Sequence, residues 1–102
     1  MRSVYQALKK GTAGHEDLGF RTQMQRASVS VMNNVAEGFE RKTPKDFAHF
    51  LDLAKGSCGE VRSMLYVAED LQYLGSKEAD DLRSGAEMIS RGIAAFTNHL
   101  RS

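Results

Sequence analysis

The fold of this chain depends on the stretch Phe20–Leu74, which reads FRTQMQRASVSVMNNVAEGFERKTPKDFAHFLDLAKGSCGEVRSMLYVAEDLQYL. It predicts two long helices that fold back on one another about the chain's single proline, Pro44. Thr43 is a good N-cap for the second of these helices, Pro44 suits its first position, and Asp46 stands three residues after the cap. Because glycine adopts the left-handed conformation that ends helices, we expect this helix to stop at Gly75.

The helix expected over residues 44–74 carries two apolar stripes at helical spacing. The first consists of Phe47, Leu51, Ala54, Cys58, Val61, Leu65 and Ala68. The second consists of Phe50, Leu53, Ser57, Met64, Val67, Leu71 and Leu74. Together they are wider than the roughly 100° face that one bundle buries. The surplus favours contact with another copy of the chain, and the wide core of a compact monomer is the alternative. The expected interface residues are Phe50, Leu53, Met64, Val67 and Leu71.

The preceding helix is expected from about residue 18 to residue 40, with Asp17 placed to cap it. Its apolar and small residues form two neighbouring stripes: Phe20, Met24, Ala27, Val31 and Gly38, and Ser28, Met32, Val35 and Phe39. Glycine inside a helix costs about 1 kcal/mol relative to alanine. Gly56 and Gly59, two glycines within four residues, therefore predict a tight helix crossing, with close approach of a ligand as the alternative. Gly38 is among the small residues of the preceding helix that are expected to let a neighbouring backbone approach closely.

Two further helices complete the expected fold. Ser76 is expected to cap the last one, about residues 77–100, and a short first helix is expected over residues 2–10. The last helix has apolar residues in alternating steps of four and three: Leu82, Ala86, Ile89, Ile93, Phe96 and Leu100. Short loops make sequential helices antiparallel. We therefore predict an all-α fold, an antiparallel up-down-up-down four-helix bundle with a short first helix, forming one domain over residues 1–102.

Composition and charge narrow the function. The sequence has neither a run of eighteen apolar residues nor an apolar N-terminal signal, so a cytoplasmic location is expected by default. The net charge is +1, but residues 1–62 carry ten Lys and Arg against seven Asp and Glu. So small a charge does not indicate a polyanion-binding monomer, although an oligomer would repeat a modest basic edge. The candidate phosphate contacts are Arg21, Arg26, Arg41, Lys42 and Lys45. For Arg41 and Lys42, favourable interaction with a helix dipole is the alternative.

No pattern in the sequence predicts catalysis. The single cysteine, Cys58, excludes an intramolecular disulfide and a cysteine-based zinc site, and it is expected to be buried and inert. Asp46 and His49 have the spacing of half a di-metal site, which would need two Glu-x-x-His pairs and two further glutamates. Glu37 and Glu60 are expected to be partly buried and to pair with a nearby arginine or amide, namely Arg26, Arg62 or Asn34, with acid–base work as the alternative. We expect a protein that is not an enzyme and that has no cofactor or metal.

Three motifs carry a family resemblance. They are Gln23-x-x-Arg26-Ala27-x-x-Ser30-Val31-x-x-Asn34-Val35-Ala36-Glu37-Gly38, then Phe47-x-x-Phe50-Leu51-x-x-Ala54-x-Gly56-Ser57-x-x-Glu60, and then Asp70-Leu71-x-Tyr73-Leu74. Over about residues 4–100 the chain resembles a bacterial four-helix-bundle family. That family includes proteins encoded in intervening sequences of large-subunit ribosomal RNA and the accessory variability determinant of diversity-generating retroelements.

The resemblance implies a four-helix bundle that assembles into a homopentameric barrel. For the retroelement branch it also implies a basic surface that binds nucleic acid and a partner reverse transcriptase. The chain departs from that branch in being weakly charged, and its first helix is shorter than is usual in the family, which leaves open whether the native chain extends upstream of Met1. Two functions are therefore expected. One is an oligomeric accessory protein that binds RNA or DNA through phosphates, and the other is an adaptor for a protein such as a reverse transcriptase.

Overall fold

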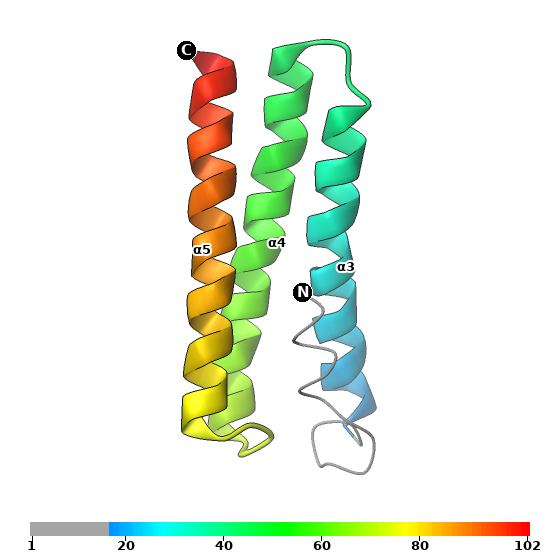
Figure 1. Cartoon of the computed structure of the whole chain (residues 1–102). Coiled ribbons are helices and arrows are strands. Elements are labelled where there is room, and N and C mark those ends of the chain that lie inside the picture. The colour runs from blue at the N-terminus through cyan, green and yellow to red at the C-terminus, as the bar shows by residue number, and fades with distance from the viewer. Residues whose placement is uncertain (1–16) are drawn as a thin grey trace.

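The computed structural model describes residues 17–102. Three helices make up this part of the chain: α3 (Leu18–Phe39), α4 (Pro44–Asp70) and α5 (Ser76–Arg101) (Figure 1). No strand occurs between residues 17 and 102, so the all-α class is confirmed. The short first helix expected over residues 2–10 lies outside the described residues. The described architecture is accordingly one of three helices.

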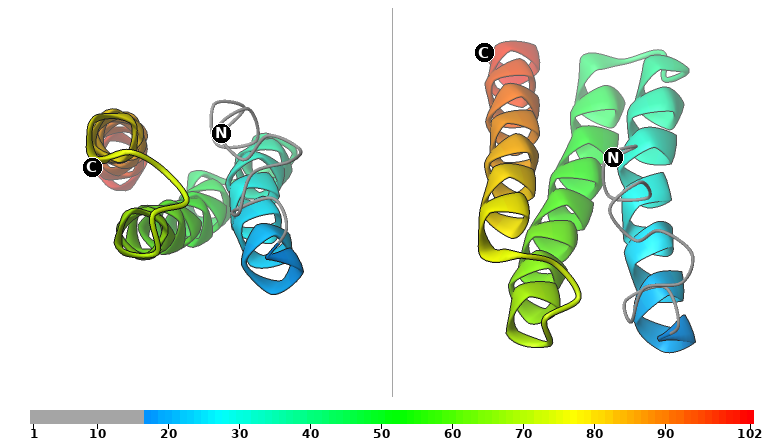
Figure 2. Two further views of the ribbon diagram at one scale, coloured as in Figure 1. Left: turned by 90° about the horizontal axis from the view of Figure 1, so that it is seen from below. Right: turned by 60° about the horizontal axis from the view of Figure 1, so that its bottom comes forward.

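Helix α4 is the centre of this arrangement. It packs against α3 on one side and against α5 on the other, while α3 and α5 barely touch one another. The end-on view shows α4 between its two neighbours (Figure 2, left). Because the connections are short, successive helices run antiparallel, and the α3–α4 turn lies at the same end as the last residues of α5 (Figure 1).

Both predicted N-caps of the first two helices are confirmed. The Asp17 carboxylate accepts a hydrogen bond from the Phe20 backbone N–H at 3.0 Å, at the start of α3. The Thr43 hydroxyl oxygen accepts one from the Asp46 N–H at 3.1 Å, with Pro44 in the first turn of α4. Each cap satisfies an N–H group that has no carbonyl partner within its own helix.

Helix α4 ends differently from the prediction, at Asp70. Two residues later, Gln72 has a φ of 62°, in the left-handed region. The N–H of Gln72 donates to the Glu69 carbonyl at 3.0 Å, and the N–H of Tyr73 donates to the Ala68 carbonyl at 2.8 Å. This pair of bonds is the Schellman motif, which usually places glycine at the left-handed position. A glutamine takes that position here, so the local sequence gave no stop signal.

The predicted roles of the next residues are consequently wrong. The chain reverses before Gly75, which has extended backbone angles and serves as the N-cap residue of α5. Gly75 has no side chain with which to cap, and Ser76, the predicted cap, is the first residue of the helix. Leu74, expected to be the last residue of the preceding helix, lies in the turn and is buried in the core.

The core consists mainly of the first predicted stripe of α4. Every member of that stripe except the half-buried Phe47 is buried. One cluster of buried residues lies near the α4–α5 turn: Met24, Ala27, Val61, Leu65, Ala68, Leu74 and Ala79. The other lies toward the opposite end: Val31, Leu51, Ala54, Cys58 and Ile93. Burial raises the pKa of the Cys58 thiol, consistent with the inert thiol expected there.

The close approach of a neighbouring helix that was expected at the small residues of α3 occurs at Gly38. A Cβ added there would lie 2.8 Å from Cδ1 of Phe47, closer than side-chain atoms normally approach. The tight helix crossing predicted at Gly56 and Gly59 is not formed within the described residues, because an added Cβ would meet no atom within 4 Å. These two glycines of α4 therefore lack a packing contact that explains them within the described chain.

Among residues 17–102 there is no helix with both the length and the apolar character needed to span a membrane.

Candidate functional site

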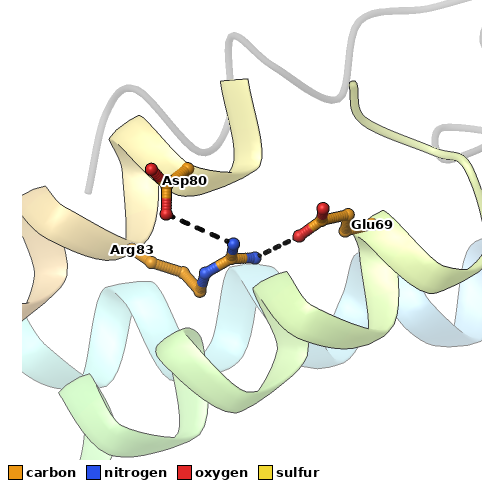
Figure 3. A network of polar contacts seen from close by, with 3 residues as sticks. All are labelled: Glu69, Asp80 and Arg83. Carbon is orange, nitrogen blue, oxygen red and sulfur yellow. Dashed lines mark hydrogen bonds and ion pairs between the residues drawn. The ribbon is translucent and has the colours of Figure 1, made fainter. Parts of the chain in front are cut away.

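Arg83 joins α5 to α4 near the turn that connects them (Figure 3). Its guanidinium donates to the Glu69 carboxylate at 2.7 Å and to Asp80 at 3.5 Å, and its Cζ lies 4.1 Å from the centre of the Tyr66 ring. The hydrogen bond from Arg83 holds the pKa of the Glu69 carboxyl below its usual range. Only 12% of the Arg83 side chain is exposed. This arginine is committed to holding the two helices together and is not available to a ligand.

Asp17 makes a similar connection between α3 and the α4–α5 turn. Its second carboxylate oxygen accepts a hydrogen bond from the Tyr73 hydroxyl at 2.5 Å, and the rings of Phe20 and Tyr73 meet edge-on with centroids 5.3 Å apart. The bond from Tyr73, together with the cap bond from the Phe20 N–H, lowers the pKa of Asp17. The sequence predicted the Asp17 cap but not the hydrogen bond from Tyr73 to Asp17, because 56 residues separate the two partners.

Acidification is expected to destabilise the fold through Asp17 and Glu69. Both carboxyls have a lowered pKa in the folded chain, so the stability they contribute is present above the unfolded pKa of about 4 and is lost as the pH falls through their folded-state values. Tyr73→Phe keeps the ring but removes the main cause of the shift at Asp17. The fall in melting temperature between about pH 5 and pH 2 should then be shallower than in the unmodified chain.

Tyr66→Phe is the matched control for this experiment. It removes a hydroxyl for which no hydrogen bond occurs among the described residues, and it leaves the ring beneath Arg83. Melting temperatures followed by circular dichroism across the acidic range should give Tyr66→Phe the slope of the unmodified chain. Equal slopes for the unmodified chain and Tyr73→Phe would contradict the assigned contact.

The structure separates the five predicted phosphate contacts into two groups. One group lies at the α3–α4 turn: Arg41, Lys42 and Lys45. The other lies in the first half of α3: Arg21 and Arg26. Fifteen residues of mostly helical chain separate Arg26 from Arg41, which corresponds to about 20 Å. The five side chains therefore do not form one continuous basic patch.

At the turn, Arg41 is already engaged. It donates to the Glu37 carboxylate at 3.3 Å and to the Glu37 carbonyl at 3.2 Å, and its Cζ lies 5.3 Å from the centre of the Phe50 ring. Glu37, expected to be partly buried and paired with Arg26, Arg62 or Asn34, is exposed and pairs with Arg41, so both parts of that prediction are wrong. Lys42 and Lys45 are exposed and form no hydrogen bond or ion pair with another of the described residues.

An open groove of about 850 Å³ lies between α3 and α4. Its polar lining residues are Gln23, Arg26, Glu60, Arg62 and Ser63, and Ala27, Gly59 and Met64 complete it. Arg26 projects from α3 and Arg62 from α4, so the packing of the two helices brings two guanidinium groups to one groove. Arg62 was not among the predicted contacts. Glu60, expected to be partly buried and paired, is exposed and has no pairing partner in the part of the chain that the structure describes.

The predicted interface residues also divide into two groups. Phe50 and Met64 are half-buried: Phe50 lies against α3 near Gly38, and Met64 packs on the core cluster at the α4–α5 end. Leu53, Val67 and Leu71 are 45%, 45% and 51% exposed. Their spacing of fourteen and four residues places Leu53 and Val67 on one face of α4, and Leu71, the C-cap residue, continues that face. They form its outward apolar face, the name used below for Leu53, Val67 and Leu71.

No metal-binding cluster is assembled by residues 17–102, in which no three His, Cys, Asp or Glu side chains are placed to hold an ion together. Asp46 and His49, the pair with di-metal spacing, are both exposed in the first turns of α4. His99 is exposed near the end of α5, and His15 lies outside the described residues.

Comparison with known proteins agrees with the motif resemblance. A family model described as "23S rRNA-intervening sequence protein" matches residues 1–95. The matched region contains all of α3 and α4 and most of α5. Among curated proteins, none matches the chain.

Proposed function

This chain belongs to the 23S rRNA-intervening sequence protein family, and from that premise we propose that it is a non-enzymatic helical-bundle scaffold that assembles into a homo-oligomeric ring, a pentamer in the form that the resemblance implies. In this proposal each subunit is a four-helix bundle, the fold that the resemblance implies. An apolar groove of about 270 Å³ bordered by α3, α4 and α5 supports the packing of a further helix there, and its lining includes Val35, Leu51, Ile93 and Phe96.

The outward apolar face of α4 carries this proposal. Leu53, Val67 and Leu71 remain about half exposed although α4 already packs against helices on two other sides. Gly56 lies on the same helix and costs about 1 kcal/mol without a contact in the described chain that compensates. Close approach of a helix from a second copy would bury the apolar side chains and use the space beside Gly56. A closed ring forms when each subunit contacts its two neighbours through two different patches and the rotation that relates neighbouring subunits returns to the first subunit.

Phosphate contact is the proposed activity of the ring. Lys42 and Lys45 are exposed cations without a partner among residues 17–102, and Arg26 and Arg62 share a groove. One subunit with a net charge of +1 offers little attraction to RNA or DNA. A ring presents the same cations several times around one axis. Simultaneous contacts from several subunits then raise the affinity for RNA or DNA, although no single subunit makes a new contact.

A protein-interaction adaptor is the second candidate, with a polypeptide such as a reverse transcriptase as its partner. Phe39 at the end of α3 and Met88 on α5 favour it, because they are 67% and 72% exposed and lie apart from the outward apolar face of α4. Exposed large apolar side chains of this kind can anchor a partner chain.

The paired substitution of Leu53→Ser and Val67→Ser is expected to weaken self-association by about a hundredfold or more. Each truncation removes half-buried apolar area at the proposed interface, for which a loss of about 1–2 kcal/mol is reasonable, and every 1.4 kcal/mol corresponds to a tenfold change. Sedimentation velocity over a dilution series measures the effect, with circular dichroism to show that helix content is retained. Met88→Ser is the control, since Met88 is exposed on a different helix. An unchanged dissociation constant in the double variant would contradict this interface.

A further inference from the structure

We propose that the groove between α3 and α4 binds a phosphate group that carries a neighbouring hydroxyl, as in a ribose phosphate. In this site Arg26 and Arg62 hold the phosphate, and Glu60 accepts a hydrogen bond from the hydroxyl. The inference deepens the phosphate-contact part of the proposed function and rests on it. It does not depend on the ring, because every residue involved belongs to one subunit.

The pairing of the arginines singles out this groove. Every other arginine between residues 17 and 102 has an interaction partner; those with an ion pair are Arg41, Arg83, Arg91 and Arg101. Arg26 and Arg62 have none within that range, and both line the same groove. Two like charges that share a groove repel one another unless an anion neutralises them. A guanidinium presents a planar fork of donors that matches phosphate oxygens, so this pair suits a phosphate better than a single lysine does.

Glu60 decides which kind of phosphate fits. It lines the groove beside the two arginines but forms an ion pair with neither, and it is exposed. A carboxylate only accepts hydrogen bonds and repels a bare anion. A ligand that satisfies Glu60 must therefore bring a donor, and the hydroxyl of a ribose next to its phosphate is such a donor. The side chains of Gln23 and Ser63 supply further polar groups in the same groove.

The size and shape of the groove agree with a ligand of this class. Its volume of about 850 Å³ falls within the range of about 300–1,000 Å³ that is usual for small-molecule sites. Gly59 leaves part of it open, since a Cβ at that position would meet nothing within 4 Å. Lys42 and Lys45, the exposed cations at the α3–α4 turn, do not line this groove. Each of these lysines carries one compact ammonium charge, whereas Arg26 and Arg62 present two planar guanidinium groups to the same groove.

Calorimetric titration of the full chain with adenosine 3′-monophosphate, in which the 2′-hydroxyl neighbours the phosphate, tests the site. Arg26→Gln and Arg62→Gln are each expected to weaken binding by about tenfold or more, because each removes charge-assisted hydrogen bonds. Lys42→Gln and Lys45→Gln are matched controls, which remove one unpaired charge each outside the groove. They are expected to change the affinity by less than about twofold. All four side chains are exposed, so circular dichroism should show unchanged folding.

Glu60 provides an independent readout. The unmodified chain should prefer adenosine 3′-monophosphate to its 2′-deoxy form by about fivefold, the value of one hydrogen bond, and Glu60→Gln should reduce that preference. Short single-stranded RNA and DNA of one sequence form the second arm. If RNA binds in an Arg26- and Arg62-dependent manner and the free nucleotide does not, the site is confirmed with RNA as the source of the ribose phosphate.

Two results would overturn the inference. One is that neither the nucleotide nor RNA binds at low salt, and the other is that the lysine controls lose as much affinity as the arginine variants. The latter result would leave phosphate contact standing but place it outside the groove. Oligomer formation is measured on the same samples. If the chain forms a ring but the groove binds no nucleotide, the scaffold function stands and the groove site is rejected. If the chain is a monomer that binds the nucleotide, the groove site stands and the ring is rejected.

Discussion

Leu65→Ala is expected to lower the free energy of unfolding by about 2–5 kcal/mol. Leu65 has no exposed surface and lies on α4 in the core cluster near the α4–α5 turn. Many of its neighbours in that cluster are alanines, Ala27, Ala68 and Ala79, which have no flexible side chain with which to fill a cavity. Because a domain of this size is stable by only about 5–15 kcal/mol, the loss is a large share of the total. Chemical denaturation followed by circular dichroism measures it.

Leu18→Ala makes the same chemical change at the start of α3, where the leucine is 62% exposed. Its effect on the unfolding free energy should stay within about 0.5 kcal/mol, as is usual for surface substitutions. If the two leucine variants lost similar stability, the core would not lie where the structure places it.

Gly38→Ala is expected to destabilise the chain by about 1–3 kcal/mol, the usual cost of overpacking. The added Cβ would lie 2.8 Å from the ring of Phe47, and that ring cannot easily move away. Its centroid is 4.9 Å from that of Phe39 on one side and 5.3 Å from that of Phe96 on another, so it is held between aromatic rings of α3 and α5. The gain in helix propensity from alanine, at most about 1 kcal/mol, offsets only part of this cost.

Gly85→Ala provides the comparison, because it makes the same change inside α5 where the new Cβ meets nothing within 4 Å. There the substitution should raise the unfolding free energy by about 0.5–1 kcal/mol. The two alanine variants are thus predicted to shift the denaturation midpoint in opposite directions. A stabilising effect of Gly38→Ala would show that α3 and α4 are not in close contact at this point.

Helical spacing predicted the parts of the fold that depend on local sequence. The caps at Asp17 and Thr43, the all-α class and the buried stripe of α4 depend on residues three to four positions apart. The end of α4 was missed because Gln72 occupies a left-handed position that glycine usually takes, and a glutamine gives no such signal. The bond between Asp17 and Tyr73 was missed for a different reason: it exists only once the helices have packed.

The candidate site was predictable only in part, for the same reason. Arg26 carries no mark that separates it from Arg21 or Arg41 in the sequence. Its groove exists because α3 and α4 pack side by side and bring Arg62 to it from 36 positions away. The width of the apolar surface of α4 was read correctly, but part of it serves α3. Phe50 and Met64 are half-buried in that way, which leaves Leu53, Val67 and Leu71 exposed and available for the proposed contact with a second copy.

The central claim is that one copy of this chain leaves an apolar face of α4 that a second copy covers. Sedimentation equilibrium of the full chain at several micromolar and higher concentrations tests it most directly. The expected mass is a whole-number multiple of 11.3 kDa, with five as the number that the resemblance implies. A single, folded species of 11.3 kDa that persists at the highest concentration would contradict the ring and with it the scaffold function.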